Sequence, residues 1–221
     1  MTTSGHRTAR WTVAVLLVVA ALIVALLVEL RHMSADWPPA AGPETSGERE
    51  HRDADTAAAL AGPRQRADLP PCLTANRRPG SASVALQAVT VECAADGSIV
   101  DVAAALAGRP AVLNFWAYWC APCTAELPAM AEYQRRAGPG VAVVTVHEDE
   151  NETAALLRLA ELGVRLPTLQ DGRRRIAAAL RVPNAIPATV VMRSDGSVAQ
   201  VLPRAFVNAD EISAAVGDHA R

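Results

Sequence analysis

The amino-acid sequence predicts an α/β fold in which a central mixed sheet is flanked by helices. Apolar runs of strand length alternate with helical segments through the second half of the chain, and such alternation is typical of an α/β architecture. Asp195-Gly196 between two apolar runs predicts a closing hairpin, which adds antiparallel strands to the sheet. With 221 residues, 51% of them hydrophobic, the chain is long enough for one full core and additional segments.

The composition excludes several classes of function. The net charge is −2 and no block of like charge occurs, so nothing indicates a nucleic-acid partner. Every basic residue other than histidine is an arginine, and the absence of lysine excludes Schiff-base chemistry and a P-loop lysine. No bound cofactor and no metal site is predicted.

The N-terminal part of the chain predicts a membrane anchor. Residues 11–30 are almost continuously Val, Leu, Ala and Ile, which is about the length that crosses a bilayer. Basic residues precede this run, so residues 1–10 are expected in the cytoplasm and the remainder outside it. A cleavable signal peptide is the alternative, but the run ends in Leu27-Val28-Glu29-Leu30 and not in the small residues of a cleavage site. We therefore expect a single-pass cell-membrane protein with an extracytoplasmic domain.

A linker is expected between the anchor and the domain. Residues 31–68 are rich in Ala, Pro, Gly, Arg and acidic residues and have little periodic apolar pattern, which favours a flexible spacer. A marginal helix is predicted within it, from Glu48 to Leu60. Residues 69–221 are expected to form the folded domain.

Turn residues and apolar periodicity divide this domain into elements. Asp96-Gly97 predicts a hairpin between the first two strands, and Gly163 predicts a helix end. The expected strands or extended pieces are 84–92, 98–102, a buried strand from 111, 141–146, 166–169, 188–192 and 197–202. The expected helices are 103–108, 124–136, 152–162, 173–180 and a last helix from Asn208 or Asp210 to Val216.

A Cys-x-x-Cys pair lies where the buried strand from Ala111 passes into the helix from Thr124. The unpaired backbone N–H groups and the positive dipole end of a helix N-terminus favour a thiolate. Two intervening residues allow Cys120 and Cys123 to close a short disulfide with little backbone movement. The pattern therefore predicts a dithiol/disulfide redox centre.

The residues around this pair resemble a known family. The segment Asn114–Cys123, followed by Glu126 and Pro128, resembles the active-site segment of the thioredoxin superfamily. Ala185-Ile186-Pro187-Ala188 resembles the cis-proline loop that faces the cysteines in that fold. The anchor, the first hairpin and the inserted helix at 152–162 resemble the TlpA/ResA/DsbE-like subgroup of membrane-anchored extracytoplasmic thiol–disulfide oxidoreductases. The resemblance extends from about Leu69 to the C-terminus.

This resemblance implies roles for the residues of the motif. Cys120 is expected to attack a substrate disulfide and Cys123 to resolve the mixed disulfide. Many thioredoxins carry a buried aspartate where this sequence has Asn114, which takes up no proton. We therefore expect Glu126 to tune the thiol pKa values and to move the proton.

The resemblance also implies a substrate-binding surface around the cysteines. Trp119 is expected to shield one side of the pair, and Pro122 to stiffen the loop between the two sulfurs. Pro187 is expected in cis against the cysteines. The Ile186 backbone would then offer strand-like hydrogen bonds to a bound substrate.

Several residues lie outside the matched motif. Cys72 and Cys93 are expected to form a structural disulfide, with a second redox relay as an alternative. A zinc site formed by all four cysteines is disfavoured because it would consume the redox pair. The segment 147–149 (His147, Glu148 and Asp149) follows a central strand and is expected to be a solvated loop, with partner docking as the alternative.

Thiol–disulfide exchange on exported proteins is the predicted function. A TlpA/ResA-like reductase is favoured, which would prepare apocytochrome c cysteines for haem or undo incorrect bridges with electrons from a membrane donor. The alternative is a DsbE/DsbF-like oxidase that requires a membrane acceptor. Two other classes on the same fold are disfavoured. A copper-delivery module would need a Cys-x-x-x-Cys pair and a distant histidine ligand, whereas the spacing here is Cys-x-x-Cys. A peroxidase would need a lone cysteine preceded by Thr or Ser, and this pattern is not found.

Overall fold

The computed structural model describes residues 56–75 and 81–217. The predicted cytoplasmic segment 1–10, the predicted anchor 11–30 and the first part of the predicted linker 31–68 lie outside the described residues. No helix among the described residues is both long enough and apolar enough to span a membrane.

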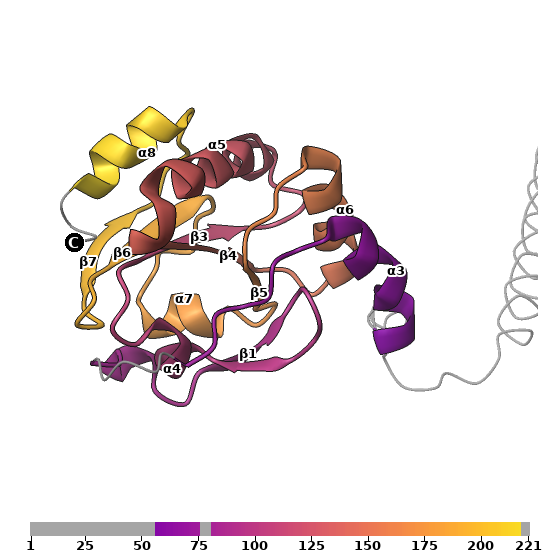
Figure 1. Cartoon of the computed structure of the whole chain (residues 1–221), viewed down its shortest axis with the longest axis horizontal. Helices are drawn as coiled ribbons and strands as arrows, with labels where there is room; N and C mark the ends of the chain where they lie inside the picture. The colour runs from indigo at the N-terminus through magenta and orange to yellow at the C-terminus, as the bar shows by residue number, and fades with distance from the viewer. Residues whose placement is uncertain (1–55, 76–80, 218–221) are drawn as a thin grey trace, which may run out of the picture. The chain divides into compact units, whose positions relative to one another are not determined.

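The described strands form one mixed sheet in the order β2-β1-β5-β4-β3-β6-β7 (Figure 1). The central strands β3, β4 and β5 are parallel, whereas β6 and β7 on one side and β1 and β2 on the other add antiparallel pairs. The predicted α/β class with a mixed sheet is therefore confirmed. The strands are β1 Thr90–Cys93, β2 Ile99–Asp101, β3 Ala111–Trp116, β4 Ala142–His147, β5 Thr168–Gln170, β6 Ala188–Met192 and β7 Val198–Leu202.

Helices cover both faces of this sheet. Side chains of α5, α6 and α8 pack in one core with Val112, Trp116 and Val143, whereas α4 and α7 pack in another with Leu113 and Val144. Figure 1 shows these two layers on opposite sides of the strands. The helices are α3 Ala57–Ala67, α4 Val102–Leu106, α5 Ala121–Ala137, α6 Glu152–Leu162, α7 Arg175–Ala179 and α8 Ala209–Val216, with 3₁₀ turns η1 Val84–Leu86 and η2 Gly138–Gly140.

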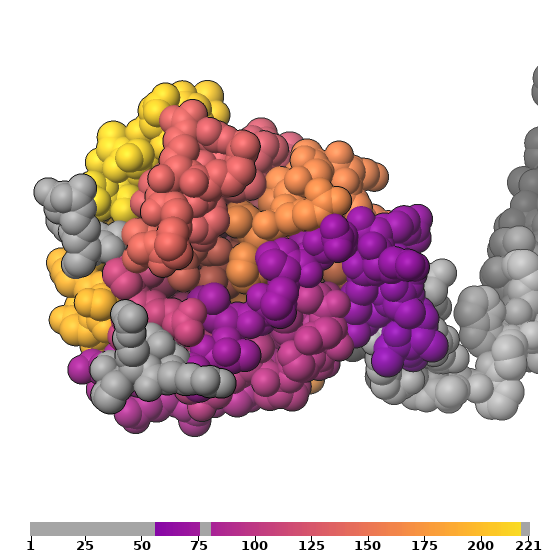
Figure 2. All heavy atoms as spheres, in the orientation of Figure 1, coloured from indigo at the N-terminus to yellow at the C-terminus, as the bar shows by residue number. Residues whose placement is uncertain are grey.

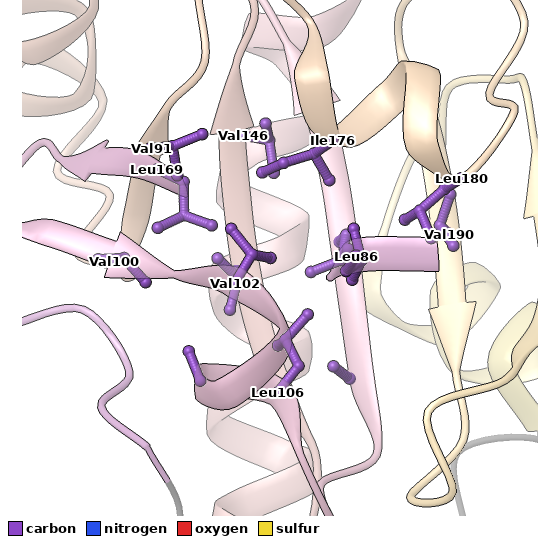
Figure 3. Close-up of a cluster of buried hydrophobic side chains, with 14 of the residues drawn as sticks. Leu86, Val91, Val100, Val102, Leu106, Val146, Leu169, Ile176, Leu180 and Val190 are labelled. Atoms are coloured by element: carbon purple, nitrogen blue, oxygen red, sulfur yellow. The ribbon is translucent and has the colours of Figure 1, made fainter. Parts of the chain in front are cut away.

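The central strand β3 is buried along its whole length. A strand between two helical layers buries both faces, which is why its sequence is a continuous apolar run interrupted only by Asn114. Figure 3 shows the core on the α7 face, where Val146 lies beside Ile176 and both belong to one cluster with Val102 and Leu86. This packing fixes the direction in which β3 emerges at its C-terminal end.

The first strand of the N-terminal hairpin begins several residues further along the chain than expected. The predicted strand 84–92 is wrong over its first half, because residues 84–86 form the 3₁₀ turn η1 and the strand begins at Thr90. Leu86 is fully buried in the α7-side core, and Ala88 has a positive φ of 62°, which interrupts an extended chain. The hairpin itself is confirmed, since β1 and β2 pair antiparallel around Gly97, whose φ is 77°.

A helix occupies part of the range expected as linker. Thr56 caps α3 by accepting a hydrogen bond from the Ala59 N–H, and the helix extends beyond the expected end at Leu60. Leu60 is buried against Leu156 of α6. Arg64 forms an ion pair with the buried Glu152 at 2.9 Å. Figure 2 shows α3 against the domain, so residues 57–67 are part of the fold.

The structure contains a disulfide between Cys72 and Cys93. Cys93 belongs to β1 and is fully buried, so the bond ties the segment after α3 to the sheet. Both cysteines pack in the core on the α4 and α7 face, whereas Cys120 and Cys123 pack on the opposite face.

Removing this bond is expected to lower stability without altering the redox pair. The double variant Cys72→Ala/Cys93→Ala should lose about 2–4 kcal/mol of unfolding free energy, because the unfolded chain is no longer cross-linked. Urea denaturation of the oxidised proteins measures this loss. Equal stability of variant and wild type, or loss of thiol exchange at Cys120, would contradict a structural role.

Candidate active site

The junction of β3 and α5 positions the two cysteines. Cys120 is the N-cap of α5, and its Sγ accepts a hydrogen bond from the Cys123 N–H at 3.3 Å. Pro122 is the second residue of the helix, where the missing N–H removes no intrahelical bond. The Cys120 sulfur therefore lies at the positive end of the α5 dipole, which stabilises a thiolate.

The two sulfurs form a disulfide in this structure and differ in accessibility. Cys120 retains 5% of its surface exposed, whereas Cys123 is fully buried. A partner molecule therefore meets Cys120 first. Two bonded sulfurs at a helix N-terminus, one of them partly accessible, are suited to two-electron dithiol/disulfide chemistry.

The Ile186–Pro187 loop lies at the same end of the sheet as the cysteines. The peptide bond between these residues is cis. β6 begins directly after the loop and runs antiparallel to β3, with Ala188 opposite Phe115. Ile186 packs against the cluster that contains Cys120 and Cys123. Neither backbone group of Ile186 is hydrogen-bonded to another residue within the described ranges, so both are available to a ligand.

Glu126 lies one turn beyond Cys123 on α5 and is fully buried. Its Oε2 accepts a hydrogen bond from Asn114 Nδ2 at 2.9 Å, and its Oε1 accepts one from the Phe206 N–H at 3.0 Å. Burial raises the pKa of Glu126 to about 7, although both hydrogen bonds act in the opposite direction. This carboxyl group can therefore gain or lose a proton near neutral pH.

Trp119 is held at the surface beside the cysteines. Its side chain is 60% exposed, and its Nε1–H donates to Asp149 Oδ2 at 2.9 Å. An exposed indole that is fixed by a carboxylate presents an apolar face to an approaching chain. Trp119 is thus fixed at the surface, adjacent in sequence to Cys120.

The segment 147–149 is not the solvated loop that the sequence suggested. His147 is fully buried, and Glu148 is 9% exposed. The Tyr118 N–H donates to His147 Nε2 at 3.4 Å, and His147 Nδ1 pairs with Gln170 Oε1 at 2.9 Å. Burial lowers the pKa of His147 to about 4, so the ring is neutral at pH 7. His147 therefore supports the backbone that leads to Cys120.

No local pattern in the sequence predicts the contacts that bury His147 and Glu148. Their partners, Gln170 and Arg174, are distant in sequence and meet the segment 147–149 only because β4 and β5 pair side by side. Among residues 56–75 and 81–217, no group of three or more His, Cys, Asp or Glu side chains is placed to hold a metal ion.

Comparison with known proteins identifies the class of this domain. Residues 84–201 match the model of the AhpC/TSA family, and the chain belongs to this family of the thioredoxin superfamily. The thiol–disulfide oxidoreductase ResA of Bacillus subtilis (strain 168) is 34% identical over 98 residues, which are 44% of this chain and 54% of ResA. The chain thus spans about half the length of this curated relative.

A curated mycobacterial relative and a solved mycobacterial structure are also similar. The soluble secreted antigen MPT53 of Mycobacterium tuberculosis (strain H37Rv) is 34% identical over 114 residues, which are 51% of this chain and 65% of MPT53. The crystal structure of a secreted M. tuberculosis disulfide oxidoreductase homologous to E. coli DsbE superposes with a TM-score of 0.53. That match is 29% identical and covers 61% of this chain and 97% of the other. The domain therefore resembles thiol–disulfide oxidoreductases of the ResA and DsbE type.

The raised pKa of Glu126 predicts a pH-dependent stability. Between about pH 4.5 and 7 the folded protein holds a proton on Glu126 that the unfolded chain has released, so stability falls as pH rises through this window. The shift in the pKa of Glu126 corresponds to a fall of about 3 kcal/mol in the unfolding free energy across this window. The pKa values of Glu148 and Asp171 are raised too, so these groups add to the pH dependence of stability in any variant. Comparison with Glu126→Gln therefore isolates the contribution of Glu126.

The unfolding free energy of the oxidised wild type should fall more steeply with pH than that of Glu126→Gln. Chemical denaturation at several pH values between 4.5 and 8 measures both slopes. Parallel slopes would show that Glu126 ionises with an ordinary pKa.

Proposed function

We propose that this protein is an extracytoplasmic oxidoreductase that exchanges disulfides of exported proteins through Cys120 and Cys123, acting as a ResA-like reductase. The observation that carries the proposal is the position of Cys120, which caps α5 and is the more accessible sulfur of the pair. The reducing direction is proposed from the resemblance of the motif to the TlpA/ResA-like subgroup, and the similarity to ResA supports an oxidoreductase without fixing the direction. Cysteines of apocytochrome c and incorrectly bridged exported proteins are the proposed substrates.

The proposed reaction begins with the reduced enzyme. The Cys120 thiolate attacks one sulfur of the substrate disulfide, and the other substrate sulfur leaves as a thiolate that takes up a proton. Cys123 then attacks Cys120, which closes the enzyme disulfide and releases the second substrate thiol. Two electrons pass from enzyme to substrate, and a membrane thiol–disulfide donor must restore the enzyme.

Glu126 is the proposed proton acceptor for the second step. Cys123 is fully buried, so its thiol needs a nearby base before it attacks Cys120. Glu126 has a pKa of about 7 and lies one helical turn away, whereas the amide of Asn114 takes up no proton. A carboxylate with a pKa near the working pH accepts and returns a proton efficiently.

Substrate binding is assigned to the two walls of the site. A substrate chain that runs beside Ile186 would pair with its unoccupied backbone N–H and carbonyl groups. Trp119 would contact the substrate from the opposite side. Pro122 and Pro187 would form the surface between the two sides, next to the two sulfurs. This recognition through the backbone suits an enzyme that acts on many protein sequences.

The proposed location follows from the N-terminal sequence and from the relatives. The apolar run at 11–30 favours a single-pass anchor in the cell membrane with the domain outside the cytoplasm. Two disulfides in the structure suit an oxidising compartment. MPT53 is described as a soluble secreted antigen, which agrees with a domain outside the cytoplasm and does not bear on the anchor.

Single cysteine variants test the assignment of attacking and resolving residues. Cys123→Ser should accumulate a mixed disulfide between Cys120 and a disulfide-containing protein, because no second thiol releases it. Cys120→Ser should form no adduct and should lose turnover. Mass spectrometry under non-reducing conditions detects the adduct, and an adduct through position 123 would reverse the assignment.

The reduction potential of the Cys120–Cys123 pair tests the direction of electron flow. A ResA-like reductase should have a potential near that of thioredoxin, roughly −270 mV. Equilibration with glutathione or dithiothreitol buffers measures it. A value near roughly −120 mV, as in DsbA, would replace the proposed reductase with a DsbE/DsbF-like oxidase.

A further inference from the structure

Glu148 is a buried carboxylate that the proposed thiol chemistry does not use. It directly follows β4, and its N–H donates to the Trp116 carbonyl at 2.9 Å, which fixes it to the end of β3. Its side chain is 2% exposed, and its Oε2 accepts a hydrogen bond from Arg174 Nε at 3.0 Å. A buried carboxylate needs such a partner, because an unpaired charge is costly in the interior.

Arg174 extends this contact to a third segment of the chain. Its Nη1 donates to Asn184 Oδ1, and its Nη2 donates to the Pro183 carbonyl at 3.5 Å. Pro183 and Asn184 belong to the segment that leads directly into the Ile186–Pro187 loop. The planar guanidinium thus joins the end of β4 to the approach of this loop, with donors directed to both.

The segment 147–149 also holds the opposite wall of the site. His147 Nε2 accepts from the Tyr118 N–H at 3.4 Å, and Asp149 Oδ2 accepts from Trp119 Nε1–H at 2.9 Å. Asp149 therefore contacts Trp119 directly, and His147 contacts the backbone of the preceding residue. Glu148 is connected through Arg174 to the segment that precedes the Ile186–Pro187 loop. The segment 147–149 thus connects Trp119 on one side with the approach of the Ile186–Pro187 loop on the other.

The backbone at Arg174 adds an independent observation. Its φ is 55°, a left-handed conformation that favours glycine or asparagine over arginine. The side-chain contacts offset this unfavourable backbone conformation. Replacement by glycine consequently removes the guanidinium while relieving the backbone, which separates the role of the side chain from a folding defect.

We propose that Arg174 is a positioning residue that, through Glu148, sets the Ile186–Pro187 loop at the spacing from Trp119 that a bound protein chain requires. This inference rests on the proposed function, since it assigns the recognition of protein disulfides to the two walls. Arg174 touches neither sulfur in the structure. It acts on substrate recognition and leaves the reactivity of Cys120 unchanged.

The test compares Arg174→Gly with Arg173→Ala. Arg173 is exposed and makes no hydrogen bond or ion pair with the other described residues, so its variant controls for the loss of one positive charge nearby. Reduction of insulin measures recognition of a protein disulfide. Reaction of the reduced enzyme with 5,5′-dithiobis(2-nitrobenzoate) measures the reactivity of Cys120 toward a small disulfide.

Arg174→Gly should raise KM for insulin at least about fivefold with kcat within about twofold, and the rate with the small disulfide should stay within about twofold. Arg174→Lys, which keeps the charge but not the planar fork, should raise KM less. Arg173→Ala should match the wild type. An unchanged KM for Arg174→Gly, or equal loss of rate with both disulfides, would overturn the proposal.

Hydrogen exchange tests the same positioning without any activity. The Ala185 N–H donates to the Pro183 carbonyl at 2.8 Å, so its exchange reports the order of this segment. Exchange at Ala185 should be faster in Arg174→Gly and unchanged in Arg173→Ala. Identical exchange in all three proteins would exclude a positioning role for Arg174. Absence of insulin reduction by the wild type would refute the proposed function and leave this measurement valid.

Discussion

The site depends on one constraint, the pairing of β3 with β4 on one side and with β6 on the other. Parallel pairing with β4 places His147 beside Trp116, and antiparallel pairing with β6 places Ala188 beside Phe115. The end of β3, the end of β4 and the start of β6 therefore meet at one edge of the sheet. The cysteines, the segment 147–149 and the Ile186–Pro187 loop each follow or precede one of these strand ends.

Burial at this edge gives the titratable groups their properties. Glu126 is covered by the core on the α5 face, where the lack of solvation outweighs two hydrogen bonds and moves its pKa to about 7. The same lack of solvation keeps His147 neutral and leaves it free to accept a hydrogen bond from the Tyr118 backbone. Loss of solvation thus gives Glu126 a pKa suited to proton transfer and keeps His147 in the neutral form that accepts a hydrogen bond from the backbone.

Buried contacts support the segment that carries the exposed Trp119. The segment between Trp116 and α5, which also contains the almost fully buried Cys120, is held by the segment 147–149. Arg174 continues this support to the approach of the Ile186–Pro187 loop. The surroundings of Cys120 are thus fixed by buried groups of the domain itself, which suits the proposed reaction with a protein chain.

The sequence by itself determined the α/β class, the order of most elements and the position of the Cys120–Cys123 pair, because these depend on local patterns: apolar periodicity, turn residues and two cysteines at a strand–helix junction. It placed β6 and α6 at their observed bounds. It did not reveal the packing of α3 on α6 or the burial of Leu86, since both depend on distant partners. Only the tertiary structure decided that His147 and Glu148 are buried supports, because their partners Gln170 and Arg174 are brought to them by strand pairing.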